Sequence, residues 1–320
     1  MPSPRTLRPG VTVMIPVRDR ARLLAETLRS VREQTRPVDE ILVIDDGSVD
    51  DSAAVARDAG ARVIVNERPG LGPAGPRNVG LEHVGTELVC PFDSDDLLLP
   101  PAIERLEAAL IDSPNAPFVF GRALSAARGE DGWHPEGIIA PLDDDLDHVL
   151  CALFARNFVP SCAAMARTAA VLSVGCYAED LPLYMDHHLW LRLARSGLPV
   201  HVPELVSVYR RHPGNLSNPV EAREPMDVIT EMANEDPRLA GCRPERLGVQ
   251  LFETVNAALK LRHPVVAAAA TWTHLVRESE RDRILRAAIR WARARRRAYR
   301  EAEALWEVDA ELRDLLSSYH

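Results

Sequence analysis

Several features that mark other classes of protein are missing from this 320-residue chain. No run of 18 apolar residues is present, so we expect no transmembrane helix. The first ten residues contain no apolar stretch typical of a signal peptide. The formal net charge of −9 argues against attraction of the whole surface to nucleic acid or anionic lipid. These absences leave an ordinary globular protein as the expectation.

The cysteines show no functional spacing either. They number five, an odd count, and none forms a C-x-x-C pair. We therefore expect unpaired thiols in a reducing cytoplasm, rather than a disulfide framework or a zinc site. The five are Cys90, Cys151, Cys162, Cys176 and Cys242.

What is present in the first 120 residues is an alternation of short apolar runs and amphipathic segments. Strands are predicted over residues 11–17, 41–44, 62–65 and 88–92, and helices over about 23–34, 52–59, 77–84 and 102–110. Strands separated by helices of this length predict an α/β fold with a mainly parallel sheet and helices on both faces. In such sheets, ligands bind beyond the carboxyl ends of the strands.

The pattern changes twice further along the chain. Between about 121 and 220 it is less regular, with helices expected near 146–156 and 187–196. Beyond Pro219, long Ala/Arg/Glu/Leu-rich helical patterns run to the end. We therefore expect a domain over residues 1–220, divided into halves near residue 120, and a helical C-terminal region over 221–320.

The strongest acidic cluster is Asp93-Ser94-Asp95-Asp96, directly after the fourth predicted strand. Carboxylates at a strand end can hold Mg²⁺ or Mn²⁺, whose remaining coordination positions bind substrate phosphates. The alternative is a solvated acidic turn that caps the next helix.

A second cluster, Asp45-Asp46-Gly47-Ser48, follows the second predicted strand. A carboxylate here can accept a hydrogen bond from a uracil ring or a ribose hydroxyl, although a simple Asx turn explains the residues as well. After the Gly/Pro-rich loop, Arg77 and Asn78 open a predicted helix, and an arginine in that position can bind phosphate.

Asp186 stands at or just before the start of another amphipathic helix. It is a candidate general base, and a helix N-cap is the competing interpretation. The neighbouring His187 and His188 are not expected to bind metal together, because adjacent helical residues diverge by about 100°.

Taken in order, these segments resemble the large inverting GT-A glycosyltransferase family, family two, over about Val11 to Ser217. The resemblance is carried by VTVMIP at 11–16, QT at 34–35, IDDGS at 44–48, AGPRNVG at 74–80, FDSDD at 92–96 with Pro100, DHHLWLRL at 186–193, and YRRH at 209–212 with Ser217. It implies a GT-A, Rossmann-like fold.

The resemblance also implies site residues, position by position. Nucleotide-binding positions would be Pro16, Val17, Arg18, Asp45, Asp46, Arg77, Asn78, Asp93 and Ser94, with Asp46 on the nucleobase. Asp95 would be the main metal ligand beside Asp93, and His212 falls where some GT-A enzymes place a histidine on the metal or diphosphate. Asp186 would be the general base.

Two positions depart from the family pattern. Arg18 stands where the family usually has an aromatic residue, and a guanidinium can also stack on a nucleobase. Met185 stands where the family usually has Glu before the base aspartate. The first departure concerns donor preference, and the second concerns the electrostatic surroundings of Asp186.

The resemblance therefore implies transfer of a sugar, with inversion, from a nucleotide-diphosphate sugar to an unidentified acceptor. A UDP-sugar is the default donor, Mn²⁺ or Mg²⁺ the cofactor, and a saccharide, lipid, peptide or small molecule the acceptor. A homodimer through the C-terminal helices is compatible with the pattern. The alternatives are a sugar-nucleotide-forming nucleotidyltransferase, whose Gly-rich loop is absent after residue 17, and a non-catalytic GT-A binding protein.

Overall fold

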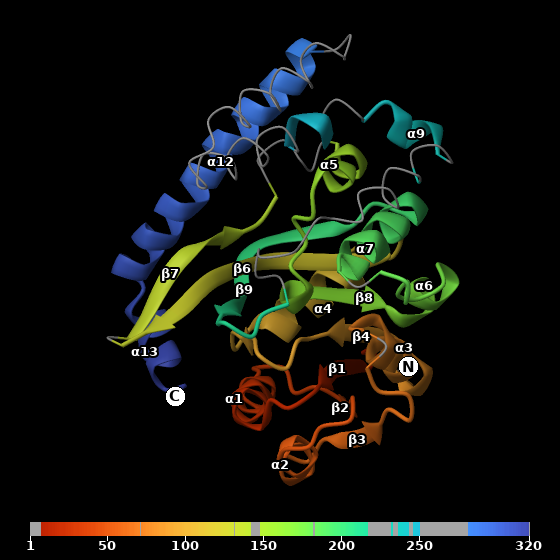
Figure 1. Ribbon diagram of the computed structural model, residues 1–320, viewed down its shortest axis with the longest axis vertical. Coiled ribbons are helices and arrows are strands. Elements are labelled where there is room, and N and C mark those ends of the chain that lie inside the picture. The colour runs from red at the N-terminus through yellow and green to blue at the C-terminus, as the bar shows by residue number, and fades with distance from the viewer. Residues whose placement is uncertain are drawn as a thin grey trace, which may run out of the picture.

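The computed structural model describes residues 8–70, 72–130, 132–141, 148–181, 183–216 and 281–319, together with 232, 236–242 and 246–249 (Figure 1). The boundary expected near residue 220, and Ser217 with it, lie outside these residues. No helix in the described part of the chain is long and apolar enough to cross a membrane.

The first four strands form the parallel half of one sheet. They are β1 (Val11–Val17), β2 (Glu40–Asp45), β3 (Arg62–Val65) and β4 (Leu88–Pro91), in the spatial order β3-β2-β1-β4. Helices α1 (Ala21–Arg32), α2 (Ser52–Asp58) and α3 (Ala74–His83) connect them. Because the strands are parallel, with Val17 paired to Asp45, the loops after β1, β2 and β4 emerge at the same edge.

The second half of the sheet is mixed rather than mainly parallel. It contains β5 (Leu97–Leu98), β6 (Phe118–Gly129), β7 (Gly132–Ile139), β8 (Ala164–Arg167) and β9 (Val200–Arg211). β8 is antiparallel to both β4 and β6, β5 is antiparallel to β9, and β6 is parallel to β9. The expectation of a mainly parallel sheet therefore holds only for the first half. Where strands pair across long sequence separations, local periodicity does not reveal the partner or whether it runs parallel.

Helices cover both faces of the sheet, and the alternation of side chains along β1 shows why. Val13 and Ile15 pack with α1 and α4 (Ala102–Asp112) in one buried cluster. Met14, between them, points to the opposite face and joins a second cluster. That second cluster includes α5 (Val149–Ala155), α6 (Thr168–Ser173) and α7 (Met185–Ser196).

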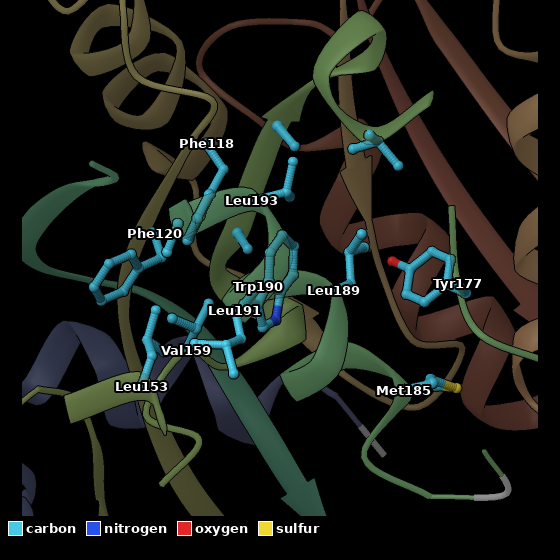
Figure 2. Packing of buried hydrophobic residues seen from close by; sticks show 14 of the residues in the cluster. Phe118, Phe120, Leu153, Val159, Tyr177, Met185, Leu189, Trp190, Leu191 and Leu193 are labelled. Carbon is cyan, nitrogen blue, oxygen red and sulfur yellow. The ribbon is translucent and has the colours of Figure 1, made fainter. Parts of the chain in front are cut away.

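Figure 2 shows how this second cluster anchors α7. The Trp190 ring is fully buried, and its centroid lies 5.0 Å from that of Phe118 on β6. Leu189 and Leu193 of the same helix are buried in the same cluster. Burying a side chain of this size stabilises the fold by about 1.5–3 kcal/mol. α7 is therefore held firmly against the sheet.

The C-terminal helices pack at two places. α9 (Pro237–Ala240) lies near α5, and its Leu239 belongs to the second cluster. α12 (Arg281–Val308) and α13 (Ala310–Ser317) pack at the other end of the sheet, where Figure 1 shows α12 running alongside β7. Ala302, Leu312 and Leu316 share a third buried cluster with Trp133 and Leu124. The helical C-terminal region predicted from the sequence is present.

One expectation about the cysteines is wrong. Cys151 in α5 and Cys242 just after α9 form a disulfide across 91 residues, with their Cα atoms 5.0 Å apart. Cys90, Cys162 and Cys176 are free. A disulfide between segments this distant has no spacing signature in the sequence. The cysteines therefore give no reason to expect a reducing compartment.

Candidate functional site

A cavity of about 720 Å³ opens at the carboxyl ends of β1, β2 and β4. Most of the site residues predicted from the sequence line it together: Pro16, Val17, Arg18, Asp46, Arg77, Asp93, Ser94, Asp95 and Asp186. The structure thus brings together side chains that lie up to 170 residues apart in the chain. Asp45, Asn78 and His212 are not among the residues that line the cavity.

The two aspartates after β2 have different surroundings. Asp45 accepts a hydrogen bond from the backbone N–H of Ser48 at 2.9 Å, and so closes the turn. Asp46 faces the cavity, and its carboxylate accepts from the Asn66 side chain at 2.6 Å and from the Gly70 N–H at 3.4 Å. The turn explanation therefore applies to Asp45, whereas Asp46 is the one of the two that lines the cavity.

The loop after β1 is tied to the loop after β2. Asp19 has a φ of 50°, and its carboxylate accepts from the Val49 N–H at 2.7 Å. A left-handed conformation in a non-glycine residue is uncommon and costs on the order of 1 kcal/mol. It turns the chain so that Arg18 and Arg20, on either side, both line the cavity.

Asn78 is used inside the protein. Its side-chain oxygen accepts from the Tyr177 N–H at 2.9 Å, and its nitrogen donates to the Tyr177 carbonyl at 2.9 Å and to Glu179 at 3.0 Å. This side chain clamps α3 to the segment after α6. Because its side chain is used in these internal hydrogen bonds, we propose no nucleotide-binding role for Asn78.

Three carboxylates gather at the loop after β4. One oxygen each from Asp93, Asp95 and Asp96 lie within 4.8 Å of one another. Asp96 was not among the sequence-based ligands, although the Asp-rich cluster itself pointed to it. One of its oxygens, Oδ1, accepts from the Arg210 N–H at 2.9 Å. The other, Oδ2, is buried and has no hydrogen-bond partner among the described residues.

Two arginines form ion pairs with this cluster. Arg77, whose side chain is 10% exposed, pairs with Asp93, and Arg20 pairs with Asp95. Arg77 also donates to the Pro73 carbonyl at 2.7 Å, and Arg20 donates to the Gly214 carbonyl at 2.8 Å. Arg20 was missed from the sequence, because nothing near it in the chain indicates that it meets Asp95.

The carboxylates of the cluster do not share the same acidity. Burial raises the pKa of Asp96 well above its usual value, and the charges of Asp95 and Asp93 raise it further. Burial also raises the pKa of Asp93, against the opposing effect of the Arg77 guanidinium. For Asp95, the hydrogen bond from His212 and the charge of Arg20 outweigh burial, so its pKa is lowered.

After burial, repulsion between neighbouring carboxylates contributes to the raised pKa values of Asp93 and Asp96. Hard carboxylate oxygens are the ligands that Mg²⁺ and Mn²⁺ prefer, and one of those oxygens is buried without a partner. The residues present therefore fit a divalent cation.

His212, at the end of β9, meets Asp95 rather than the cavity. Its Nε2 lies 2.9 Å from Oδ2 of Asp95, and its Nδ1 accepts from the Gly214 N–H at 3.1 Å. An Nδ1 that accepts leaves the ring proton on Nε2, so the histidine donates to Asp95. The position of the ring is further held by Asn215, which accepts from the His212 N–H at 2.6 Å.

Asp186 lies in the first turn of α7 but does not cap it. The N-cap position is taken by Tyr184, with a φ of 59°. One Asp186 oxygen, Oδ2, accepts from Asn157 at 3.0 Å and from Ser161 at 3.1 Å. The capping explanation therefore does not account for this side chain, which lines the cavity.

The two histidines after Asp186 point elsewhere. His187 is buried and its Nε2 donates to the Leu153 carbonyl, away from the acidic cluster. Burial lowers the pKa of His187 to about 4. Among the described residues, the aspartate cluster is the sole group with the arrangement of a metal site.

Comparison with known proteins identifies the family of the chain. A family described as glycosyl transferase family 2 matches residues 12–171. The amylovoran biosynthesis glycosyltransferase AmsE of Erwinia amylovora is 28% identical over 193 residues, which cover 58% of this chain and 70% of that protein. An uncharacterised protein of Mycobacterium tuberculosis, MT1568, is 30% identical over 225 residues, or 64% and 68% of the two chains.

Solved structures show the same fold. Residues 1–349 of S. aureus TarS, in complex with UDP-GlcNAc, match with a TM-score of 0.62 at 18% identity, over 93% of this chain and 91% of that one. Another TarS structure matches with a TM-score of 0.60 at 21% identity, and this chain spans 55% of its length. The fold is GT-A, and the chain belongs to glycosyl transferase family 2.

Proposed function

We propose that this protein transfers a sugar from a nucleoside diphosphate sugar to an acceptor hydroxyl or amine, with inversion, using a divalent cation and Asp186 as general base. The observation that carries the proposal is that Asp186 and the Asp93–Asp96 cluster line the same cavity. A base and a leaving-group site that share one cavity are what a single displacement at the anomeric carbon needs.

The donor nucleotide would occupy the edge formed by β1 and β2. Asp46 faces this part of the cavity with its carboxylate oriented by Asn66, and would accept from the nucleobase. Arg18, which is exposed and lines the cavity, would stack on the base. A UDP-sugar is the default donor, and the likeness to TarS, solved in complex with UDP-GlcNAc, supports it.

The diphosphate would lie over the acidic cluster. Asp93, Asp95 and Asp96 would hold Mn²⁺ or Mg²⁺, which when bound neutralises the negative charge that develops on the leaving diphosphate. Arg77 would bind a phosphate oxygen through charge-assisted hydrogen bonds. Arg77 lines the cavity and forms an ion pair with Asp93. A hydrogen bond to the Pro73 carbonyl holds its side chain in place.

Asp186 would take the proton of the acceptor as that group attacks the anomeric carbon. It is half-buried and faces the cavity from the α7 side, while the aspartate cluster lies after β4. An acceptor entering between them would approach the sugar from the face opposite the diphosphate, and that geometry inverts the anomeric centre.

The C-terminal helices would have a structural role. α12 and α13 pack against the sheet through Ala302, Leu312 and Leu316, and no described residue beyond Leu216 lines the cavity. We assign them to the stability of the fold. A homodimer through them stays a prediction.

The test is sugar-nucleotide hydrolysis and transfer with Mn²⁺, on a panel of nucleoside diphosphate sugars that begins with UDP-GlcNAc. Asp186→Asn should keep nucleotide affinity and lower the rate by about 10²-fold or more. Asp95→Asn should lose both metal-dependent nucleotide binding and turnover. If Asp186→Asn turns over at the wild-type rate, the base assignment fails. If EDTA leaves nucleotide affinity unchanged, the metal assignment fails.

A further inference from the structure

The carboxylate of Asp186 is held on one side only. Both of its side-chain hydrogen bonds end on Oδ2, from Asn157 Nδ2 at 3.0 Å and from Ser161 Oγ at 3.1 Å. Within the described part of the chain, no hydrogen bond reaches Oδ1. The side chain is half-buried and lines the cavity. Because both hydrogen bonds end on Oδ2, the two oxygens of the carboxylate are not equivalent.

The amide of Asn157 can only donate to Asp186. Its own oxygen accepts from the Val159 N–H at 3.2 Å, which fixes the amide with its nitrogen toward the carboxylate. A flipped amide would lose that bond and present an oxygen to Oδ2. The turn after α5 therefore sets the direction of this hydrogen bond.

The Ser161 hydroxyl is fixed by the fold around it. Ser161 begins a 3₁₀ turn, Ser161–Ala163, in which the Ala163 N–H donates to the Pro160 carbonyl at 2.9 Å. The neighbouring Phe158 and Cys162 are buried with at most 1% of their surface exposed. Both donors thus come from a segment whose apolar side chains anchor it in the core.

We infer that Asn157 and Ser161 are positioning residues, which hold Asp186 through Oδ2 so that Oδ1 faces the acceptor and takes its proton. Two donors on one oxygen fix the rotation of the carboxylate, and that orientation is what a base needs before the reaction begins. The inference rests on the proposed role of Asp186.

Other charged or titratable groups also face Asp186. Arg77 from α3, Asp93 after β4 and Tyr177 after α6 interact with it electrostatically, as does His187 on its own helix. None of the variants below changes these four side chains. A change in the titration of Asp186 in those variants therefore reports on Asn157 and Ser161.

The first variant is Asn157→Asp, which keeps an oxygen for the Val159 N–H but places a second carboxylate about 3 Å from Asp186. Like charges at that distance share a proton. We expect the acidic limb of donor hydrolysis, measured with UDP-GlcNAc and Mn²⁺, to move to higher pH by about one unit or more. The matched control is Asn115→Asp, which adds the same charge at an exposed position on another part of the surface.

The second pair is Ser161→Ala and Ser161→Thr. Ser161→Ala should lower the rate and move the acidic limb in the same direction by a smaller amount, because one donor to the charged form is lost. Ser161→Thr keeps a hydroxyl and should show the wild-type pH dependence of donor hydrolysis. Affinity for UDP with Mn²⁺ should be unchanged throughout, and Ser173→Ala, on the exposed side of α6, is the control.

A direct measurement makes the test independent of turnover. In protein labelled with ¹³C at the aspartate carboxyls, the resonance that Asp186→Asn removes should titrate at higher pH in Asn157→Asp. An unmoved titration midpoint and an unmoved acidic limb would overturn the positioning role. If Asp186→Asn retains wild-type turnover, the proposed function fails instead, so the two failures are distinguishable.

Discussion

The Nε2 atom of His212 lies 2.9 Å from the Oδ2 atom of Asp95, although 117 residues separate them in the chain. The Gly214 N–H occupies Nδ1 of the same ring, so Nε2 holds the proton and points it at the carboxylate. The histidine that the sequence placed on the metal therefore acts on Asp95 in this structure. A ring nitrogen can ligate a metal only through a free lone pair.

We predict that His212→Gln weakens Mn²⁺ binding by about tenfold or less, the low end of the loss expected for a group that orients a ligand. A glutamine amide can still donate toward Asp95. Calorimetry with Mn²⁺ gives the affinity. Pulsed EPR of the Mn²⁺-loaded protein checks the assignment, and a coupling to a directly bound imidazole nitrogen that vanishes in the variant would refute it.

Arg20→Gln should have opposite effects on the two ligands. Arg20 and His212 both contact Oδ2 of Asp95, and a cation would bind at the same oxygen. Removing the guanidinium takes a positive charge and one of two donors away from that oxygen, so Mn²⁺ alone should bind about threefold to tenfold more tightly. UDP with saturating Mn²⁺ should bind more weakly, because a cavity-lining arginine is a phosphate ligand.

Calorimetry of the two ligands separately measures both effects. Arg22→Gln is the control, since this arginine lies in the first turn of α1, two residues after Arg20, with a side chain that is 76% exposed. Weaker Mn²⁺ binding in Arg20→Gln would show that the arginine supports the metal site instead of competing for it.

The sequence predicted the nucleotide-binding half well, because its signals are local. The β-branched apolar run over 11–17 and the helical spacing after it are short-range patterns, and β1 and α1 appear where they were expected. The acidic clusters directly follow predicted strands. Asp46, Asp93 and Asp95 could therefore be placed at one edge of the sheet from the sequence alone. Parallel topology alone brings those ends together.

The rest of the site depends on pairings that have no local signature. Arg20 meets Asp95 across 75 residues, and Ser161 meets Asp186 across 25. The mixed half of the sheet has the same cause, since β6 pairs with β8 and β9, which lie much further along the chain. Single-sequence periodicity cannot specify such partners.

Loss of the disulfide should cost stability but leave the site intact. Cys151 and Cys242 close a loop of 91 residues, and a cross-link of this kind stabilises a protein by about 2–4 kcal/mol. Urea unfolding of Cys242→Ser should show that decrease relative to the oxidised wild type. Cys176→Ser, at a free cysteine, is the control. Five titratable thiols in the unreduced, denatured wild type would contradict the pairing.

Ending the chain at residue 280 should cause aggregation. This truncation removes α12 and α13 and exposes the apolar partners they cover, among them Trp133 and Leu124. Exposed patches of this kind drive self-association. Light scattering after size-exclusion chromatography measures it. A monodisperse truncated protein that binds UDP with Mn²⁺ normally would show that the helices are dispensable for the fold.

Stability should fall in mild acid, in part because of His187. Its pKa is lowered by burial to about 4 in the folded protein, against 6.5 for the exposed group. Below pH 6.5 the unfolded chain binds a proton that the folded protein does not, so stability is complete above pH 6.5 and is lost as the pH falls toward 4. The shift corresponds to about 2 kcal/mol between pH 7 and pH 5.

The comparison that isolates this histidine is His187→Leu. The variant starts from lower stability at every pH, because the Leu153 carbonyl loses its donor. Its loss of stability between pH 7 and pH 5 should nevertheless be smaller than that of wild type by about 2 kcal/mol. Urea unfolding at the two pH values measures both, with His134→Leu, at an exposed position of β7, as control. Since His188 and His201 also have pKa values lowered to about 4 by burial, some acid sensitivity should persist in the variant. If the variant and the wild type lost the same stability between pH 7 and pH 5, His187 would be taking up its proton without unfolding the core around α7.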